Sequence, residues 1–141
     1  MRRIIFSALL LALAATTAAC AAASGGTSGL TGKVWHLTAI TEKVPAFQGV
    51  VPEADQANYT IEFKPAGTFQ AKADCNQVSG PYTTTSSGGM TITLGPMTLA
   101  FCPEGSMGDQ YAAALGRTDS YVVASDVLTL NQNDGGTLSF K

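Results

Sequence analysis

Apolar and polar residues alternate along most of the chain from about residue 33 to its end. The alternation is clearest at 59–64, where Tyr59, Ile61 and Phe63 fall on one face of an extended chain and polar residues fall on the other. A period of two indicates a half-buried β-strand. Similar segments, separated by turn-forming residues at 65–68, 86–89, 125–126 and 133–136, occupy 34–39, 69–73, 82–85, 90–94, 121–124, 127–130 and 137–140. The pattern predicts about eight short strands joined largely by hairpins.

One segment follows a helical period instead. Apolar residues recur at the spacing of a helix face at Met107, Tyr111, Ala114 and Leu115. Ser106 and Asp109 form a weak start signal of the capping-box kind, and Gly116 is a stop signal, so a helix of about ten residues is expected. Hairpins with one helix, and no alternation of strands with helices, predict a mainly β fold built as an antiparallel barrel or sandwich.

The segment 44–58 has two prolines and no sustained alternation, and it is predicted to be a long loop rather than a strand. Its apolar stretch from Val44 to Pro52 leaves two interpretations open. Long loops often carry function, but this loop could instead pack across one end of the barrel.

The first twenty residues have the plan of an export signal. Arg2 and Arg3 precede an apolar run of roughly 12 residues, which is too short to span a membrane as a helix. Small residues then lead to Cys20, as in a bacterial lipobox, although the position three before the cysteine is usually Leu and here is Thr17. We therefore predict a lipoprotein signal peptide over 1–20 and a lipid on Cys20. The alternative is ordinary cleavage after 21–23, which would discard Cys20; both interpretations place the domain outside the cytosol.

Composition and charge indicate how the rest of the chain is divided and which partners are expected. Residues 21–32 are small and polar and are predicted to be a flexible linker, so that 33–141 forms a single domain. Without Arg2 and Arg3 the chain has 6 basic and 10 acidic residues, a net charge of −4, and the basic residues are dispersed. Nucleic acid is not an expected partner, because phosphate binding needs a basic face. The expected partners are a bacterial cell membrane or outer membrane, through the anchor, and other envelope proteins; the domain is expected to be a monomer.

The other two cysteines, Cys75 and Cys102, lie in the body of the chain and are predicted to form a disulfide in an oxidising compartment. A bridge that closes this loop contributes roughly 3 to 4 kcal/mol in the chain-entropy model. Zinc would need further ligands, and His36 is the sole histidine in the sequence. A redox pair would typically be written C-x-x-C, which is absent. No metal or cofactor is expected.

No pattern of residues indicates catalysis. His36 lies on the strand face opposite Trp35 and Leu37, so it is expected to point toward solvent or a neighbouring strand. The candidate carboxylates have no spacing that forces them together, namely Glu62, Asp74, Glu104 and Asp109. The sequence therefore predicts a protein that is not an enzyme.

The segment from Asp74 to Tyr82 resembles the C-N-x-x-x-G-x-Y signature of the META domain, a family that includes the heat-shock protein HslJ. Other motifs agree in order over about 33–141: an opening W-x-L, a G-P-M-T segment, a cysteine followed by proline, a helix rich in alanine, and a closing L-T-L…G-G-T-L-S-F. The resemblance implies a small calycin-like or lipocalin-like antiparallel β-barrel with one short α-helix, in an exported or lipid-anchored envelope protein. It also implies an association with heat shock and envelope stress, with no shared catalytic activity.

The signature residues have a structural and a binding interpretation. Asn76 and Gly80 suit a tight loop, the first through side-chain to backbone hydrogen bonds and the second through positive φ. Tyr82 would then bury its ring and donate its hydroxyl to a backbone carbonyl. A binding role for Asn76, Gly80, Tyr82 and Trp35 remains the alternative.

The expected function is that of a non-enzymatic, lipid-anchored envelope protein that acts through protein contacts in stress tolerance. The alternative is a carrier of a small apolar ligand in the barrel mouth, which would need an open cavity lined by Tyr59, Ile61 and Phe63.

Overall fold

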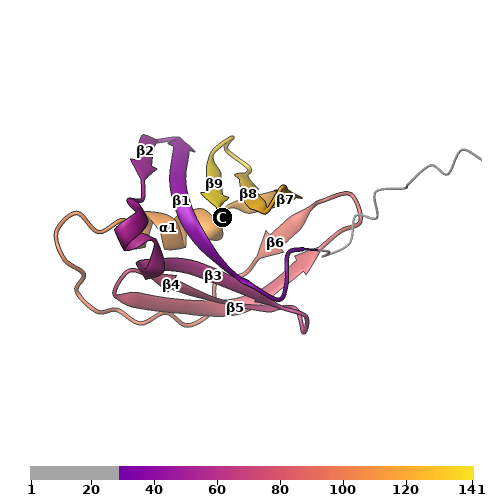
Figure 1. The fold of residues 1–141 in the computed structure, drawn as a ribbon, viewed down its shortest axis with the longest axis horizontal. Coiled ribbons are helices and arrows are strands. Elements are labelled where there is room, and N and C mark those ends of the chain that lie inside the picture. Colours follow the sequence, from indigo (N-terminus) through magenta and orange to yellow (C-terminus); the bar gives the residue numbers. More distant parts are fainter. Residues whose placement is uncertain (1–28) are drawn as a thin grey trace, which may run out of the picture.

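The computed structural model describes residues 29–141 (Figure 1). The predicted signal peptide, Cys20 and most of the predicted linker lie outside these residues. The described part contains one α-helix, α1 (Gly108–Leu115), one 3-10 helix, η1 (Glu53–Asn58), and nine strands. The strands are β1 (Val34–Lys43), β2 (Ala46–Val50), β3 (Tyr59–Lys64), β4 (Thr68–Ala73), β5 (Asn76–Thr84), β6 (Met90–Ile92), β7 (Thr118–Ala124), β8 (Val127–Gln132) and β9 (Thr137–Phe140).

The strands form an antiparallel sheet in the order β6-β5-β4-β3-β1-β9-β8-β7, and β2 pairs with the second half of β1. The two ends of this sheet approach each other, since the turn before β6 reaches β7: Gly89 bridges to Ser120, and the backbone N–H of Tyr121 donates to the Gly88 carbonyl at 2.9 Å. The sheet is therefore a nearly closed barrel. The predicted mainly β, calycin-like fold with one short α-helix is confirmed.

Side chains of the protein fill the centre of the barrel. Each strand directs alternate residues inward, and the largest fully buried residues are Trp35, Tyr111, Phe63, Phe69 and Phe140. Helix α1 packs against the barrel through Tyr111, which is completely buried and whose hydroxyl donates to the Thr60 carbonyl at 3.1 Å. Within residues 29–141 no helix has the length and apolar character needed to cross a bilayer.

The segment 44–58 differs from the prediction of a loop. It contains strand β2, which pairs with β1 from Ala39↔Val50 to Lys43↔Ala46, followed by η1. Gly49 and Val51 are buried, so part of the segment packs on the domain instead of projecting from it. The prediction failed because the prolines hid a strand whose partner is the extended end of β1.

Two further boundaries differ from the sequence expectation. The folded part starts before residue 33, because Leu30 is fully buried and Thr31 pairs with Phe63, which removes 29–32 from the predicted linker. Helix α1 has 8 residues and begins after Met107 without a side-chain cap; the Ser106 hydroxyl instead accepts from the Gly108 N–H at 3.1 Å. The capping-box expectation was wrong.

A bulge in β1 changes which residues face inward. The pairing of β1 with β9 shifts register between Leu37 and Ala39, so Ile40 is fully buried whereas Ala39 is not. The inward face predicted through Trp35, Leu37 and Ala39 therefore holds for the first two residues only.

Candidate functional site

The most distinctive surface of the domain is the segment that joins β6 to α1, which we call the β6–α1 loop (residues 93–107). The predicted disulfide is present and ties this loop to the β4–β5 turn, with 5.4 Å between the Cα atoms of Cys75 and Cys102. This separation is typical of disulfides in proteins. The disulfide thereby fixes one point of this long connection covalently to the barrel.

Asn76 provides the second attachment. Its side chain is 95 % buried, and its Oδ1 atom accepts from the Ala100 N–H at 2.7 Å and from the Thr98 hydroxyl at 3.0 Å. Its Nδ2 atom donates to the Ala100 carbonyl at 3.1 Å. One amide side chain thus pairs with both backbone groups of Ala100, much as a neighbouring strand would. The expectation of a tight loop around Asn76 was wrong, because the residue lies in β5 and its hydrogen bonds hold a distant segment.

Position 80 requires glycine because neighbouring backbone atoms leave no space for a Cβ atom, and not because its φ is positive. It lies within β5, and a Cβ atom at this position would overlap the Thr93 carbonyl oxygen and come within 2.9 Å of the Gly95 nitrogen. The backbone N–H of Gly95 donates to the Ser79 carbonyl at 2.8 Å. The predicted positive φ was wrong: Gly80 allows the start of the β6–α1 loop to lie directly against β5.

Tyr82 and Trp35 both belong to the core. The Tyr82 hydroxyl donates to the Lys64 carbonyl at 2.9 Å, and its ring meets Phe63 edge-on with 4.9 Å between centroids. Burial raises the pKa of Tyr82, with a smaller contribution from Tyr121. The Trp35 indole N–H donates to the Leu30 carbonyl at 2.8 Å. These contacts favour the structural interpretation of both side chains.

The fixed loop carries two apolar side chains that point into solvent. Leu99 is 86 % exposed and Phe101 is 103 % exposed, and both flank Ala100, the residue that Asn76 holds. Exposed large apolar side chains on a constrained segment are typical of contact surfaces.

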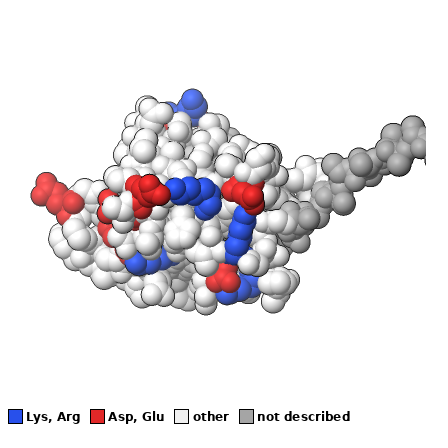
Figure 2. Space-filling model, in the orientation of Figure 1, with Lys and Arg blue, Asp and Glu red and all other residues white. Residues whose placement is uncertain are grey.

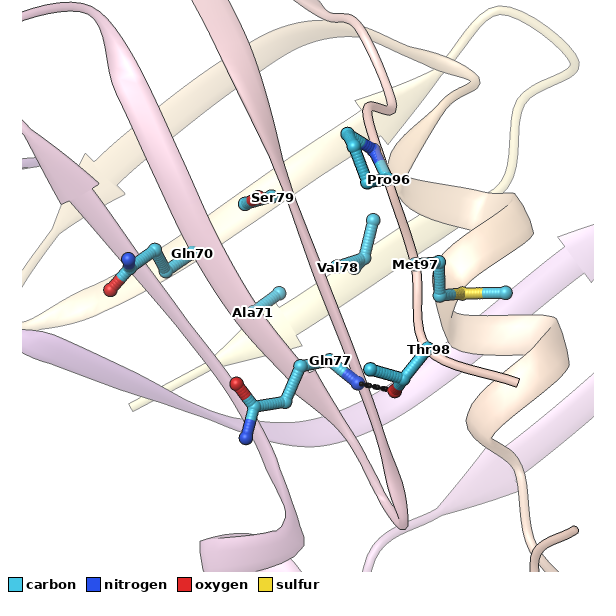
Figure 3. Close-up of a pocket in the computed structure, with 8 residues that line it drawn as sticks. All are labelled: Gln70, Ala71, Gln77, Val78, Ser79, Pro96, Met97 and Thr98. Carbon is cyan, nitrogen blue, oxygen red and sulfur yellow. Dashed lines mark hydrogen bonds between the residues drawn. The ribbon is translucent and has the colours of Figure 1, made fainter. Parts of the chain in front are cut away.

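Grooves border this loop on several sides. One of about 330 Å³ lies between the loop and strands β4 and β5, and its walls are Gln70, Ala71, Gln77, Val78, Ser79, Pro96, Met97 and Thr98 (Figure 3). Figure 3 shows the Thr98 hydroxyl accepting from the Gln77 N–H, which links the two walls at 2.9 Å. Val78 and Met97 also line a second groove of about 330 Å³ against Ala112 and Ala113 of α1.

The other side of the loop forms a larger groove, which we call the acidic groove. It measures about 510 Å³, and carboxylates of Asp55, Asp74 and Glu104 lie along its walls. Apolar parts of Val50, Tyr59 and Met107 also line it. The Tyr59 hydroxyl accepts from the Met107 N–H at 3.1 Å, which holds the end of the loop in place.

A carrier of a small apolar ligand would need an open cavity inside the barrel, but side chains fill the interior. Ile61 and Phe63 are fully buried and Tyr59 is 5 % exposed. The Tyr59 ring meets Tyr111 edge-on at 6.3 Å between centroids. These side chains fill the interior instead of lining a ligand cavity, so the structure disfavours the carrier.

Among the hydrogen bonds of residues 29–141, the His36 side chain has a backbone partner and not a Ser, Cys, Asp or Glu side chain. The contact of its Nδ1 atom is the Gln56 carbonyl at 3.3 Å. In the described part of the chain, no group of three or more His, Cys, Asp and Glu side chains is arranged to hold a metal ion.

A cluster of charged side chains, which the sequence analysis did not predict, forms around Arg117. The Arg117 guanidinium forms an ion pair with Glu42, which is 92 % buried, and its Nε atom lies 3.4 Å from the Asp134 carboxylate. The register of β1 after its bulge turns Glu42 inward two residues after Ile40. The ion pairs link β1, the start of β7 and the β8–β9 turn, which is a structural role.

Comparisons with known proteins agree with the fold. A family model described as "META domain" matches residues 28–141. No curated protein matches. The NMR structure of a protein from Burkholderia xenovorans aligns with a TM-score of 0.60 at 22 % identity, covering 82 % of this chain and 84 % of that chain. The crystal structure of a DUF4847 family protein from Bacteroides vulgatus aligns with a TM-score of 0.56 at 16 % identity, covering 81 % and 94 %. At these identities the two structures establish likeness of fold alone.

Proposed function

Because the chain belongs to the META domain family, we propose that it is a non-enzymatic, lipid-anchored envelope protein that acts through protein contacts in stress tolerance. The observation that carries the proposal is the β6–α1 loop. It is fixed by the Cys75–Cys102 disulfide and by Asn76, and it presents Leu99 and Phe101 to solvent. A packed barrel with one rigid apolar tip suits a protein that binds another protein better than it suits a carrier or an enzyme.

The position of the N-terminal end supports this arrangement. The described chain begins at the end of the barrel near the β7–β8 turn, where Gly29 approaches Val123. The β6–α1 loop lies at the opposite end (Figure 1). A lipid on Cys20 would therefore attach the domain to its membrane from the end opposite to the one that the β6–α1 loop reaches.

The anchor is tested by intact mass spectrometry of the full-length protein purified from its own envelope. The expected product begins at Cys20 and carries added acyl mass, and the Cys20→Ala variant lacks both features. A mature protein that begins after residue 23 would contradict lipidation.

The contact surface is tested separately, by survival of cells after heat and envelope stress. Cells that carry the double variant Leu99→Ser, Phe101→Ser should survive as poorly as cells without the protein, although the variant accumulates and folds normally. The matched control is Val122→Ser, because Val122 is a 54 % exposed apolar residue on β7, away from the loop. Normal survival with the double variant would exclude the loop as the functional surface.

A further inference from the structure

The excess negative charge of the domain is concentrated beside the apolar tip. The full chain contains 10 acidic residues, and five of those have no Lys or Arg within 4.0 Å among residues 29–141: Asp55, Asp74, Glu104, Asp109 and Asp119. The first three line the acidic groove, and Asp109 lines the groove that contains Phe101. Figure 2 shows acidic side chains projecting at the end of the molecule where Figure 1 places the β6–α1 loop.

The basic residues do not neutralise this end. Lys33, Lys64, Arg117 and Lys141 are each engaged with a carboxylate outside the acidic groove. Lys72 is the exception: its ammonium group donates at 2.8 Å to the side chain of Asn58, which lines the groove, so one positive charge lies beside three carboxylates. The groove therefore keeps a negative potential next to exposed apolar carbon, and such a combination attracts cations that also carry apolar groups.

We propose that the tip of the β6–α1 loop and the acidic groove together form a docking site for a basic segment of another protein that carries apolar side chains. This inference rests on the proposed function and names the chemistry of the partner. Lysine or arginine side chains of the partner would lie along Asp55, Asp74 and Glu104. Its apolar side chains would cover Leu99 and Phe101, which a hydrophilic partner would leave in water.

Charge argues against the two other occupants of an apolar surface. An anionic lipid surface would be repelled by the unpaired carboxylates of the groove. A second copy of this chain would place the same carboxylates opposite each other, which costs free energy at an interface. A basic protein segment with apolar side chains can contact both the apolar tip and the carboxylates of the acidic groove.

The test uses the full-length protein in phosphatidylcholine nanodiscs, with empty nanodiscs as the reference. The probe is a short fluorescent peptide of lysines interrupted by two leucines, and its affinity is measured by anisotropy. One control peptide has glycines in place of the leucines, and another has glutamates in place of the lysines. The lysine and leucine peptide should bind, more weakly as salt is raised, and both control peptides should bind at least about tenfold more weakly.

Variants of the protein assign the binding to this site. Neutralising the groove with Asp55→Asn, Asp74→Asn and Glu104→Gln should weaken the peptide about tenfold, whereas Asp119→Asn should leave its affinity unchanged. Leu99→Ser with Phe101→Ser should weaken it similarly, and Val122→Ser should not. Circular dichroism and the fluorescence of Trp35 check that every variant is folded.

Several results would overturn the inference. Equal binding of the glutamate peptide or the glycine peptide would do so, as would unchanged affinity after the groove is neutralised. Binding to anionic vesicles, or concentration-dependent self-association that the loop variant abolishes, would assign the surface to a membrane or to a second copy. If the loop variant fails in the survival assay while no peptide binds, the proposed function stands and the basic partner is wrong.

Discussion

Removing the disulfide should destabilise the domain chiefly through the unfolded chain. The perturbation is the double replacement Cys75→Ala, Cys102→Ala. Cys75 is exposed and Cys102 is half-buried, so little packing is lost. The native loop also keeps the hydrogen bonds between Asn76 and Ala100. What changes is that the unfolded chain gains the freedom of an open loop.

The magnitude follows from the length of that loop. The cysteines are 27 positions apart, and the chain-entropy relation gives about 3.6 kcal/mol at 25 °C for a closed loop of this size. This is a large part of the ~5 to 15 kcal/mol by which domains are stable. With a urea slope of about 2 kcal/mol per molar, the unfolding midpoint should fall by roughly 1.8 M.

The assay is urea unfolding followed by the fluorescence of Trp35, the sole tryptophan of the sequence and a fully buried one. Wild-type protein treated with reductant should lose the same stability as the double variant, and reductant should not change the variant further. A loss below about 1 kcal/mol would refute the reasoning, because it would mean that the unfolded chain is already constrained around this segment.

Three further predictions concern single residues. Asn76→Ala should lower the free energy of unfolding by about 1 to 3 kcal/mol in the urea assay, more than Thr98→Ala, because the Asn76 side chain makes the larger set of hydrogen bonds to the loop. Gly80→Ala should cost about 1 to 3 kcal/mol, since its methyl group overlaps the Thr93 carbonyl, whereas Ser79→Ala should change the thermal midpoint little. Burial raises the pKa of Tyr111 well above 10.0. Above about pH 10 this tyrosine therefore ionises in the unfolded chain and stays neutral in the folded protein. The free energy of unfolding then falls by up to about 1.4 kcal/mol per pH unit. Tyr111→Phe should flatten that fall in urea titrations between about pH 9 and 11, and an unchanged slope would contradict the assignment.

Local patterns were sufficient for most of the strands but not for the segment 44–58. Alternation at 59–64 identified β3 because its inward residues are all apolar, and the turn residues at 65–68 identified the hairpin that follows. Strand β2 lies between Pro45 and Pro52 and gains its structure by pairing with β1. Such pairing depends on the tertiary fold, which no window of sequence contains.

The candidate site was only partly predicted, because its contacts also join residues that lie far apart in the sequence. The cysteines indicated a disulfide, and the signature drew attention to Asn76, but its hydrogen-bond partner Ala100 lies 24 positions away without a local signal. Glu42 and Arg117, which are 75 positions apart, were also missed. An acidic residue two positions after the buried Ile40 was a usable signal, but the bulge in β1 had to be known first.

The entry of the chain into the barrel has a mechanical consequence. Leu30 is fully buried, its carbonyl holds the Trp35 indole, and Thr31 pairs with Phe63 of β3. A force applied through the N-terminus must therefore extract an apolar side chain and separate a bridge before it reaches the first long strand. Tension on a tether would be resisted where the chain meets the domain, so that stretching the linker leaves the far tip undisturbed.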